Sequence, residues 1–326
     1  MKTTTQNLKD GAVNIISNGD VNIRVYNTND AIQDQVIIVD RQGKGVAIEL
    51  PAFHNSVEEI TKYLKDEKIE IIGKLVSYHA AGASFLPEIK NYLTSSAVKY
   101  NTDGEGAGLV KNFSGIFGEA FDSSIANSGE KLEAGKITLA GIDFEIIPNA
   151  EAYEVVIPSL KAVYVHMIGH DCHSIVAGAG HADAIIANLR GYLDRGIEVF
   201  LSSHYVPETR QDVETKIAYV KELKVIAAAS KDADDFKTKV NAKYAGTRSA
   251  KNEGLCVAGL DANNEQFVRL VTNDEKMKNI HSASAHWKIY HLQSIRLYIF
   301  QFSCICSHDC NIPSSILRCQ CNRKTM

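Results

Sequence analysis

The sequence predicts an α/β protein folded as an αββα sandwich, in which two mixed sheets carry outer helices. Three observations support this class. Strand-like and helix-like runs follow one another as strands, helix, strand, helix, and this order then repeats. Each half therefore mixes sheet with amphipathic helices, whose apolar faces must pack against a sheet. The composition, 45% hydrophobic and 23% charged, is that of a globular chain able to bury a full core.

The first half opens with antiparallel strands. Short β-type runs occupy residues 21–27, 35–40 and 45–50, and Gly43 and Gly45 mark the turn between the last two. Apolar residues at helical spacing predict a helix in NSVEEITKYLKDEK, residues 55–68. We expect a buried strand in residues 69–79, a helix in 87–100, and irregular structure in the Gly-, Ser- and Asn-rich residues 101–130.

The second half repeats this scheme. Residues 130–149 predict two strands joined at Ala140-Gly141, and residues 153–167 predict two more joined at Pro158-Ser159. The remaining patterns predict, in order, a helix ended by Gly196, a strand in IEVFLSSH and a helix in DVETKIAYVKELKVIAAA.

Composition also limits the setting and the partners. The net charge of -4 does not favour nucleic acid. The start of the chain, MKTTTQNLKDGAVNII, lacks a signal-peptide pattern, and no apolar run of ~18 residues predicts a membrane span. Seven cysteines, an odd number that is sparse in the body of the chain, argue against a secreted disulfide framework. We expect a cytoplasmic protein whose partner is a small-molecule substrate or ligand.

The last 51 residues differ from the rest. Residues 1–275 contain every predicted element and form one domain, whereas 276–326 are aromatic and Cys-rich without a clear period. We interpret 276–326 as an unpacked or artefactual tail. Two alternatives are a packing extension and a small zinc module, whose ligands would come from Cys304, Cys306, His308, Cys310, Cys319 and Cys321.

One short segment concentrates the polar chemistry. Residues 163–183, VYVHMIGHDCHSIVAGAGHAD, hold four histidines, one cysteine and two aspartates. Asp171 lies between His170 and His173, where a carboxylate would orient an imidazole for proton transfer, so we take both histidines as candidate catalytic residues lining a cleft. Cys172 has no sequence context of a cysteine hydrolase, and His181 is expected to start a helix.

The element order resembles the metallo-β-lactamase superfamily over about residues 20–245. VIIVDRQGKGVAIEL is similar to its opening hairpin, and IEIIGKLVSYHAAGASFLPEIK to the strand and loop that carry H-x-H-x-D-H. NAEAYEVVIPSLKAVYVHMIGHDCHSIVAG resembles the alkylsulfatase-like branch. That resemblance places Glu151 at the first metal carboxylate, His166 at the second, and His204 of SSHYVPE at the late histidine, and it implies that these three residues bind metal.

The metal loop departs from the superfamily pattern. Aligning SYHAAGA with T-H-x-H-x-D-H puts Tyr78 at the first histidine, Ala80 at the second, Gly82 at the aspartate and Ala83 at the third. Ala and Gly offer no ligand to zinc, so the site is degenerate and holds at most one ion. His79 lies one position out of register and is a third candidate catalytic residue.

Two hypotheses of different classes follow. The first is a hydrolase-like protein in which one zinc or other divalent metal, held by Glu151, His166 and His204, serves the hydrolysis of an ester-like small molecule. The alternative is a non-catalytic module of the same fold that binds a small molecule or a protein. The Tyr78–Ala83 loop favours the second hypothesis, and the late ligands favour the first.

Overall fold

The computed structural model describes residues 2–174, 176 and 178–244. The predicted tail and the domain boundary near residue 275 lie outside the described residues. Among the described residues, no helix combines the length and the apolar character that crossing a bilayer requires.

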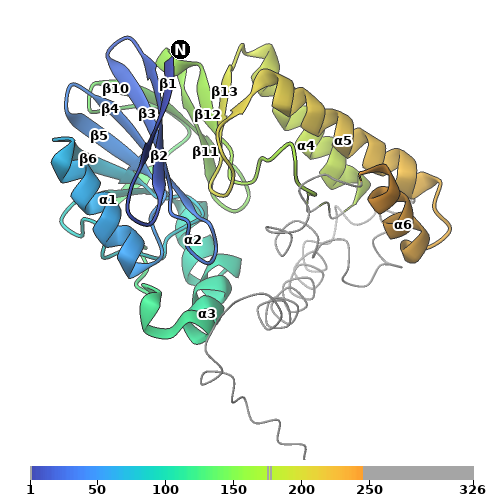
Figure 1. Ribbon diagram of the computed structural model, residues 1–326, viewed down its shortest axis with the longest axis horizontal. Helices are drawn as coiled ribbons and strands as arrows, with labels where there is room; N and C mark the ends of the chain where they lie inside the picture. The colour runs from blue at the N-terminus through green and yellow to red at the C-terminus, as the bar shows by residue number, and fades with distance from the viewer. Residues whose placement is uncertain (1, 175, 177, 245–326) are drawn as a thin grey trace, which may run out of the picture.

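Two sheets form the centre of the molecule (Figure 1). The first follows chain order from β1 to β8. Its strands are β1 Lys2–Asn7, β2 Ala12–Asn18, β3 Val21–Asn27, β4 Gln35–Arg41, β5 Lys44–Ile48, β6 Glu70–Leu75, β7 Asn91–Thr94 and β8 Glu130–Leu132. Pairing is antiparallel up to β5 and parallel from β5 to β8, so this sheet is mixed, as predicted.

The second sheet has the order β14-β13-β12-β11-β10-β9. Its strands are β9 Gly135–Leu139, β10 Ile142–Pro148, β11 Tyr153–Ile157, β12 Ala162–Tyr164, β13 Val199–Leu201 and β14 Glu208–Thr209. The β12–β13 pair is parallel and the others are antiparallel. The backbone N–H of Gln35, at the start of β4, donates to the carbonyl of Ser203 in the loop after β13 at 2.7 Å.

Helices lie on both outer sides of this pair of sheets (Figure 1). They are α1 His54–Asp66, α2 Ser95–Thr102, α3 Glu105–Phe117, α4 Ala179–Asp194, α5 Arg210–Ala228 and α6 Ala233–Lys243. In β11, Val155 and Ile157 pack in the core between the sheets, while Val156 packs with the residues of α4 and α5. This alternation buries both faces of the strand, and the αββα sandwich is confirmed.

Two predicted segments differ from the structure. Residues Asn91–Thr94 were expected to be helical but form β7, because Tyr92 and its neighbours pair with β6 on one side and β8 on the other. The helix begins only at Ser95, where the Thr94 hydroxyl accepts the N–H of Ala97.

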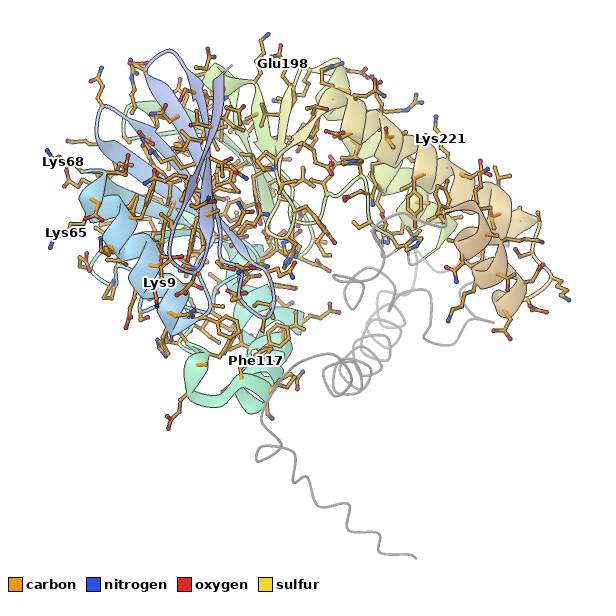
Figure 2. The ribbon with its side chains drawn as sticks, viewed as in Figure 1. Lys9, Lys65, Lys68, Phe117, Glu198 and Lys221 are labelled. Carbon is orange, nitrogen blue, oxygen red and sulfur yellow. The ribbon has the colours of Figure 1, made fainter. Side chains whose placement is uncertain are left out.

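The segment expected to be irregular contains α3. Its glycines disfavour a helix, but tertiary packing outweighs that propensity. Phe117, labelled in Figure 2 near the end of α3, packs edge-on against Phe53 with ring centroids 5.2 Å apart, and Phe113 contacts Phe121 at 5.9 Å. The strands β1 and β2 were also missed, because the polar Thr, Gln and Asn residues there lack a clear apolar alternation.

Candidate functional site

Three histidines from separate loops meet at one edge of the sandwich. His79 follows β6, His166 follows β12 and His204 follows β13. Because β12 and β13 are parallel, the loops after them leave the same edge of the second sheet. The contact between Gln35 and Ser203 holds this edge against the first sheet.

The three imidazole rings form a nearly equilateral triangle. Their centroids lie 5.0 Å apart between His79 and His166, 4.8 Å between His79 and His204, and 5.2 Å between His166 and His204. One nitrogen from each ring lies within 4.8 Å of the other two. Within the described part of the chain, this is the one group of three or more His, Cys, Asp or Glu residues arranged closely enough to hold a metal ion.

Burial keeps these imidazoles neutral. The side chains of His79 and His204 are 15% and 11% exposed. Burial lowers the pKa of His79 from 6.5 to about 4. Burial and the neighbouring imidazoles also lower the pKa of His166 and His204 well below the usual value. At neutral pH all three rings therefore carry a free lone pair, which is the form that binds a metal.

The contribution of His79 to the stability of the metal-free protein should be lost as the pH falls from 6.5 towards 4. Because the pKa of His79 is lower in the folded chain, the unfolded chain binds more protons at this group in this range, and the contribution of His79 is fully present only above about 6.5. His79 alone contributes about 3 kcal/mol to this loss. Urea unfolding of chelator-treated protein across this range measures the effect. His79→Gln should show a shallower pH dependence, and an unchanged slope in that variant would contradict the assignment.

A buried carboxylate holds the loop that carries His79. Glu49 is fully buried, and its oxygens accept the backbone N–H groups of Ser77 at 3.2 Å, Tyr78 at 2.8 Å and His79 at 2.9 Å. The hydroxyl of Tyr164 donates to the same carboxylate. Glu49 has a φ of +64°, which non-glycine residues rarely adopt, and these hydrogen bonds hold it there.

The same carboxylate determines which nitrogen of His166 carries the proton. Glu49 accepts the Tyr164 proton, so the Tyr164 oxygen accepts from Ser203 Oγ at 2.6 Å. Ser203 Oγ has then used its proton and must accept from His166 Nδ1 at 3.2 Å. His166 is therefore the Nδ1–H tautomer, and its Nε2 lone pair is free for a ligand.

Two tyrosines support the ring of His166. Tyr78 stacks on it with centroids 4.1 Å apart and planes at 12°, and Tyr100 meets Tyr78 edge-on at 5.5 Å. The Tyr78 hydroxyl accepts a hydrogen bond from Asn149 at 2.9 Å. Tyr78 is thus an aromatic ring that orients a neighbouring histidine.

The rest of that loop is shaped by the backbone. Gly82 has a φ of +86°, and a Cβ atom there would lie 1.9 Å from the carbonyl oxygen of Pro51. The Gly82 N–H donates to the carbonyl of Asp122 at 3.0 Å. Position 82 thus admits no side chain without moving the backbone.

Asp34 is a site residue that the sequence reasoning missed. It immediately precedes β4, its side chain is 2% exposed, and its Oδ1 lies 3.5 Å from Nδ1 of both His79 and His204. Burial raises its pKa, and the charges of Asp30 and Glu49 add to that effect. Its signal in the sequence is weak, because an acidic residue before a strand is commonly a solvated turn residue.

Glu151, expected as a ligand, is not part of the three-histidine group. It lies in the turn between β10 and β11, where its backbone N–H donates to Asn149 Oδ1 at 3.1 Å. Its charge contributes to the raised pKa of Tyr78 and Tyr100, after the larger effect of burial. Glu151 is therefore near the tyrosine side of the site, and His79 is the third member of the group with His166 and His204.

His170 and His173 do not join the group either. His170 Nδ1 pairs with the buried Glu208 at 2.8 Å. Burial acts to lower the pKa of His170, but Glu208 and Asp212 outweigh it and the pKa is raised. His173 is buried against α5, where Nδ1 contacts the Tyr219 hydroxyl at 2.8 Å. Of the three histidines expected to be catalytic, only His79 lies in the group.

Comparison with solved structures identifies the architecture. The chain is similar to the sec-alkylsulfatase Pisa1 of a Pseudomonas species, in a double-mutant form, with 13% identity and a TM-score of 0.50 over 69% of this chain. The chain has the metallo-β-lactamase fold. It spans 44% of the length of that alkylsulfatase.

Two metallo-β-lactamases are also similar to this metallo-β-lactamase-fold chain. The enzyme from Erythrobacter litoralis has 12% identity, a TM-score of 0.46 and coverage of 67% of this chain and 100% of its own. DIM-1 has 13% identity, a TM-score of 0.42 and coverage of 68% of this chain and 98% of its own. No family model matches the chain. A search of curated proteins likewise returns no significant match.

Proposed function

We propose that this chain is a hydrolase-like protein that holds one divalent metal ion, zinc, on His79, His166 and His204, and acts on an ester-like small molecule. The observation that supports this most directly is the convergence of three buried, neutral imidazoles from three loops. Three protein ligands with one open position are typical of catalytic zinc sites, and three histidines form one of the known sets.

The residues present fit such an ion. One nitrogen from each of the three imidazoles lies within 4.8 Å of the others, so a single ion could contact all three. The donor set of imidazole nitrogens with a nearby carboxylate suits zinc.

Each part of the site has a defined task. Glu49 positions the backbone of residues 77–79, and the chain of hydroxyls from Glu49 to Ser203 holds His166 in one tautomer. Tyr78 covers one face of His166 and excludes water from it. His79, His166 and His204 would hold the zinc, which when bound would supply a Lewis acid and a water of lowered pKa.

A non-catalytic binding module is the second candidate. It is favoured by the loop from Ala80 to Ala83, which offers no second set of ligands and no side-chain acid or base. In this case the site would bind a small molecule without turning it over, since the fold does not by itself carry an activity.

Metal content and ester hydrolysis together test the proposal. Protein purified without chelator should contain about one zinc per chain by elemental analysis. It should hydrolyse at least one member of a panel of carboxylic, sulfate and phosphate esters, and dialysis against a chelator should remove both the metal and the activity. Stoichiometric zinc without turnover of any ester would favour the binding module. Metal-free protein that cannot be loaded with zinc would rule out the metal site.

A further inference from the structure

Three buried polar atoms, one of them from Asp34, lie close together without a hydrogen bond to any described residue. Asp34 Oδ1, His79 Nδ1 and His204 Nδ1 have no hydrogen-bond partner among the described residues, yet the oxygen lies 3.5 Å from each nitrogen. A closing of about 0.3 Å would bring each pair to the ~3.2 Å upper limit of an N–H···O bond. Each of the three atoms therefore has a polar partner within this small cluster.

With Asp34 ionised, counting donors and acceptors decides how the atoms pair. A carboxylate oxygen has two lone pairs and no proton, while a neutral imidazole carries its proton on either Nδ1 or Nε2. If both protons were on Nε2, two nitrogen lone pairs would face an oxygen lone pair, and all three buried atoms would remain unsatisfied. With both protons on Nδ1, one oxygen accepts two hydrogen bonds and all three atoms are satisfied.

We propose that Asp34 is a positioning residue that holds His79 and His204 together in the Nδ1–H tautomer, so that both rings present Nε2 to the ligand. His166 reaches the same state through Ser203, Tyr164 and Glu49. All three histidines then offer an equivalent lone pair. Metal-binding histidines commonly donate their second N–H to a carboxylate, and here one carboxylate serves two rings.

The positioning role of Asp34 rests on the proposed metal site, but the tautomers of His79 and His204 are tested in the metal-free protein. The full chain, labelled with ¹⁵N in histidine and treated with chelator, is examined by long-range ¹H–¹⁵N NMR near pH 7.5. Single His→Gln variants assign the signals. We expect a protonated Nδ1 and an unprotonated Nε2 for His79 and for His204.

Asp34→Ala removes the shared acceptor. In this variant His79 and His204 should no longer both carry the proton on Nδ1. The zinc affinity of the protein should fall about 10–100-fold. Asp30→Asn is the matched control. It removes a partly buried negative charge from the same loop, and the Asp30 side chain contacts Ile32, Gln33 and Ser56 rather than the histidines. The charge of Asp30 raises the pKa of Asp34, so its removal favours the ionised carboxylate, and the tautomers should match the wild type.

Several results would overturn the inference. The first is a wild-type protein in which His79 or His204 carries its proton on Nε2, including the mixed pair that a protonated Asp34 would cause. The second is an Asp34→Ala variant whose tautomers are unchanged. If Asp34→Ala does not fold, the wild-type spectrum still decides. Adding zinc separates the two proposals. A change in chemical shift confined to the Nε2 signals supports both, whereas coordination through Nδ1 overturns the role of Asp34. If zinc does not bind, the proposed metal site is ruled out, but the tautomers measured without metal still stand.

Discussion

Alanine at position 79, 166 or 204 is expected to leave the protein without bound metal after dialysis, whereas Glu151→Ala keeps it. Each histidine supplies one of three ligands. If a zinc site of four ligands contributes ~10–16 kcal/mol, one ligand contributes roughly 2.5–4 kcal/mol, which lowers affinity roughly 10²–10³-fold. Elemental analysis after equilibrium dialysis measures the zinc retained by each variant.

Two variants control for this experiment. Glu151→Ala tests the ligand set implied by the resemblance to the alkylsulfatase-like branch, because Glu151 lies in the β10–β11 turn. His170→Ala removes a histidine that is paired with Glu208 outside the group. Loss of zinc from Glu151→Ala with full retention in His79→Ala would restore the set of Glu151, His166 and His204 and contradict the one proposed here.

Glu49→Ala should destabilise the protein by at least about 3 kcal/mol. The change leaves one buried and two partly buried backbone N–H groups and the buried Tyr164 hydroxyl without their acceptor, and each buried unsatisfied group costs about 1–3 kcal/mol. For a domain of this size the melting temperature should fall by about 6–12 °C. Thermal melts of chelator-treated protein measure the shift without any contribution from metal.

Glu58→Ala is the matched control for Glu49→Ala. Glu58 is an exposed residue of α1, and its removal should change stability by no more than about 0.5 kcal/mol. A melting temperature for Glu49→Ala equal to that of Glu58→Ala would mean that the loop from Ser77 to His79 does not depend on Glu49. The explanation of the His79 position would then fail.

Much of the fold could be predicted because local patterns agree with the final packing. The turn at Ala140-Gly141 is an example, since both residues adopt positive φ and connect β9 to β10 as expected. The apolar residues of β11 and α5 likewise face the layers that their spacing indicates. By contrast, α3 depends on the contacts of Phe113 and Phe117 with distant aromatic residues, which a local pattern does not contain.

By itself, the sequence determined the sandwich class, the order of most elements and the choice of His79, His166 and His204 as candidate site residues. These follow from periodicity and residue type, which are local properties. Only the tertiary structure brought Asp34 and Glu49 to the histidines and left Glu151 in a neighbouring turn. These placements depend on which loops meet where two sheets pack, and on backbone conformations such as that of Gly82 against Pro51. A carboxylate acquires its role from burial and from the donors that surround it, and both exist only in the folded chain.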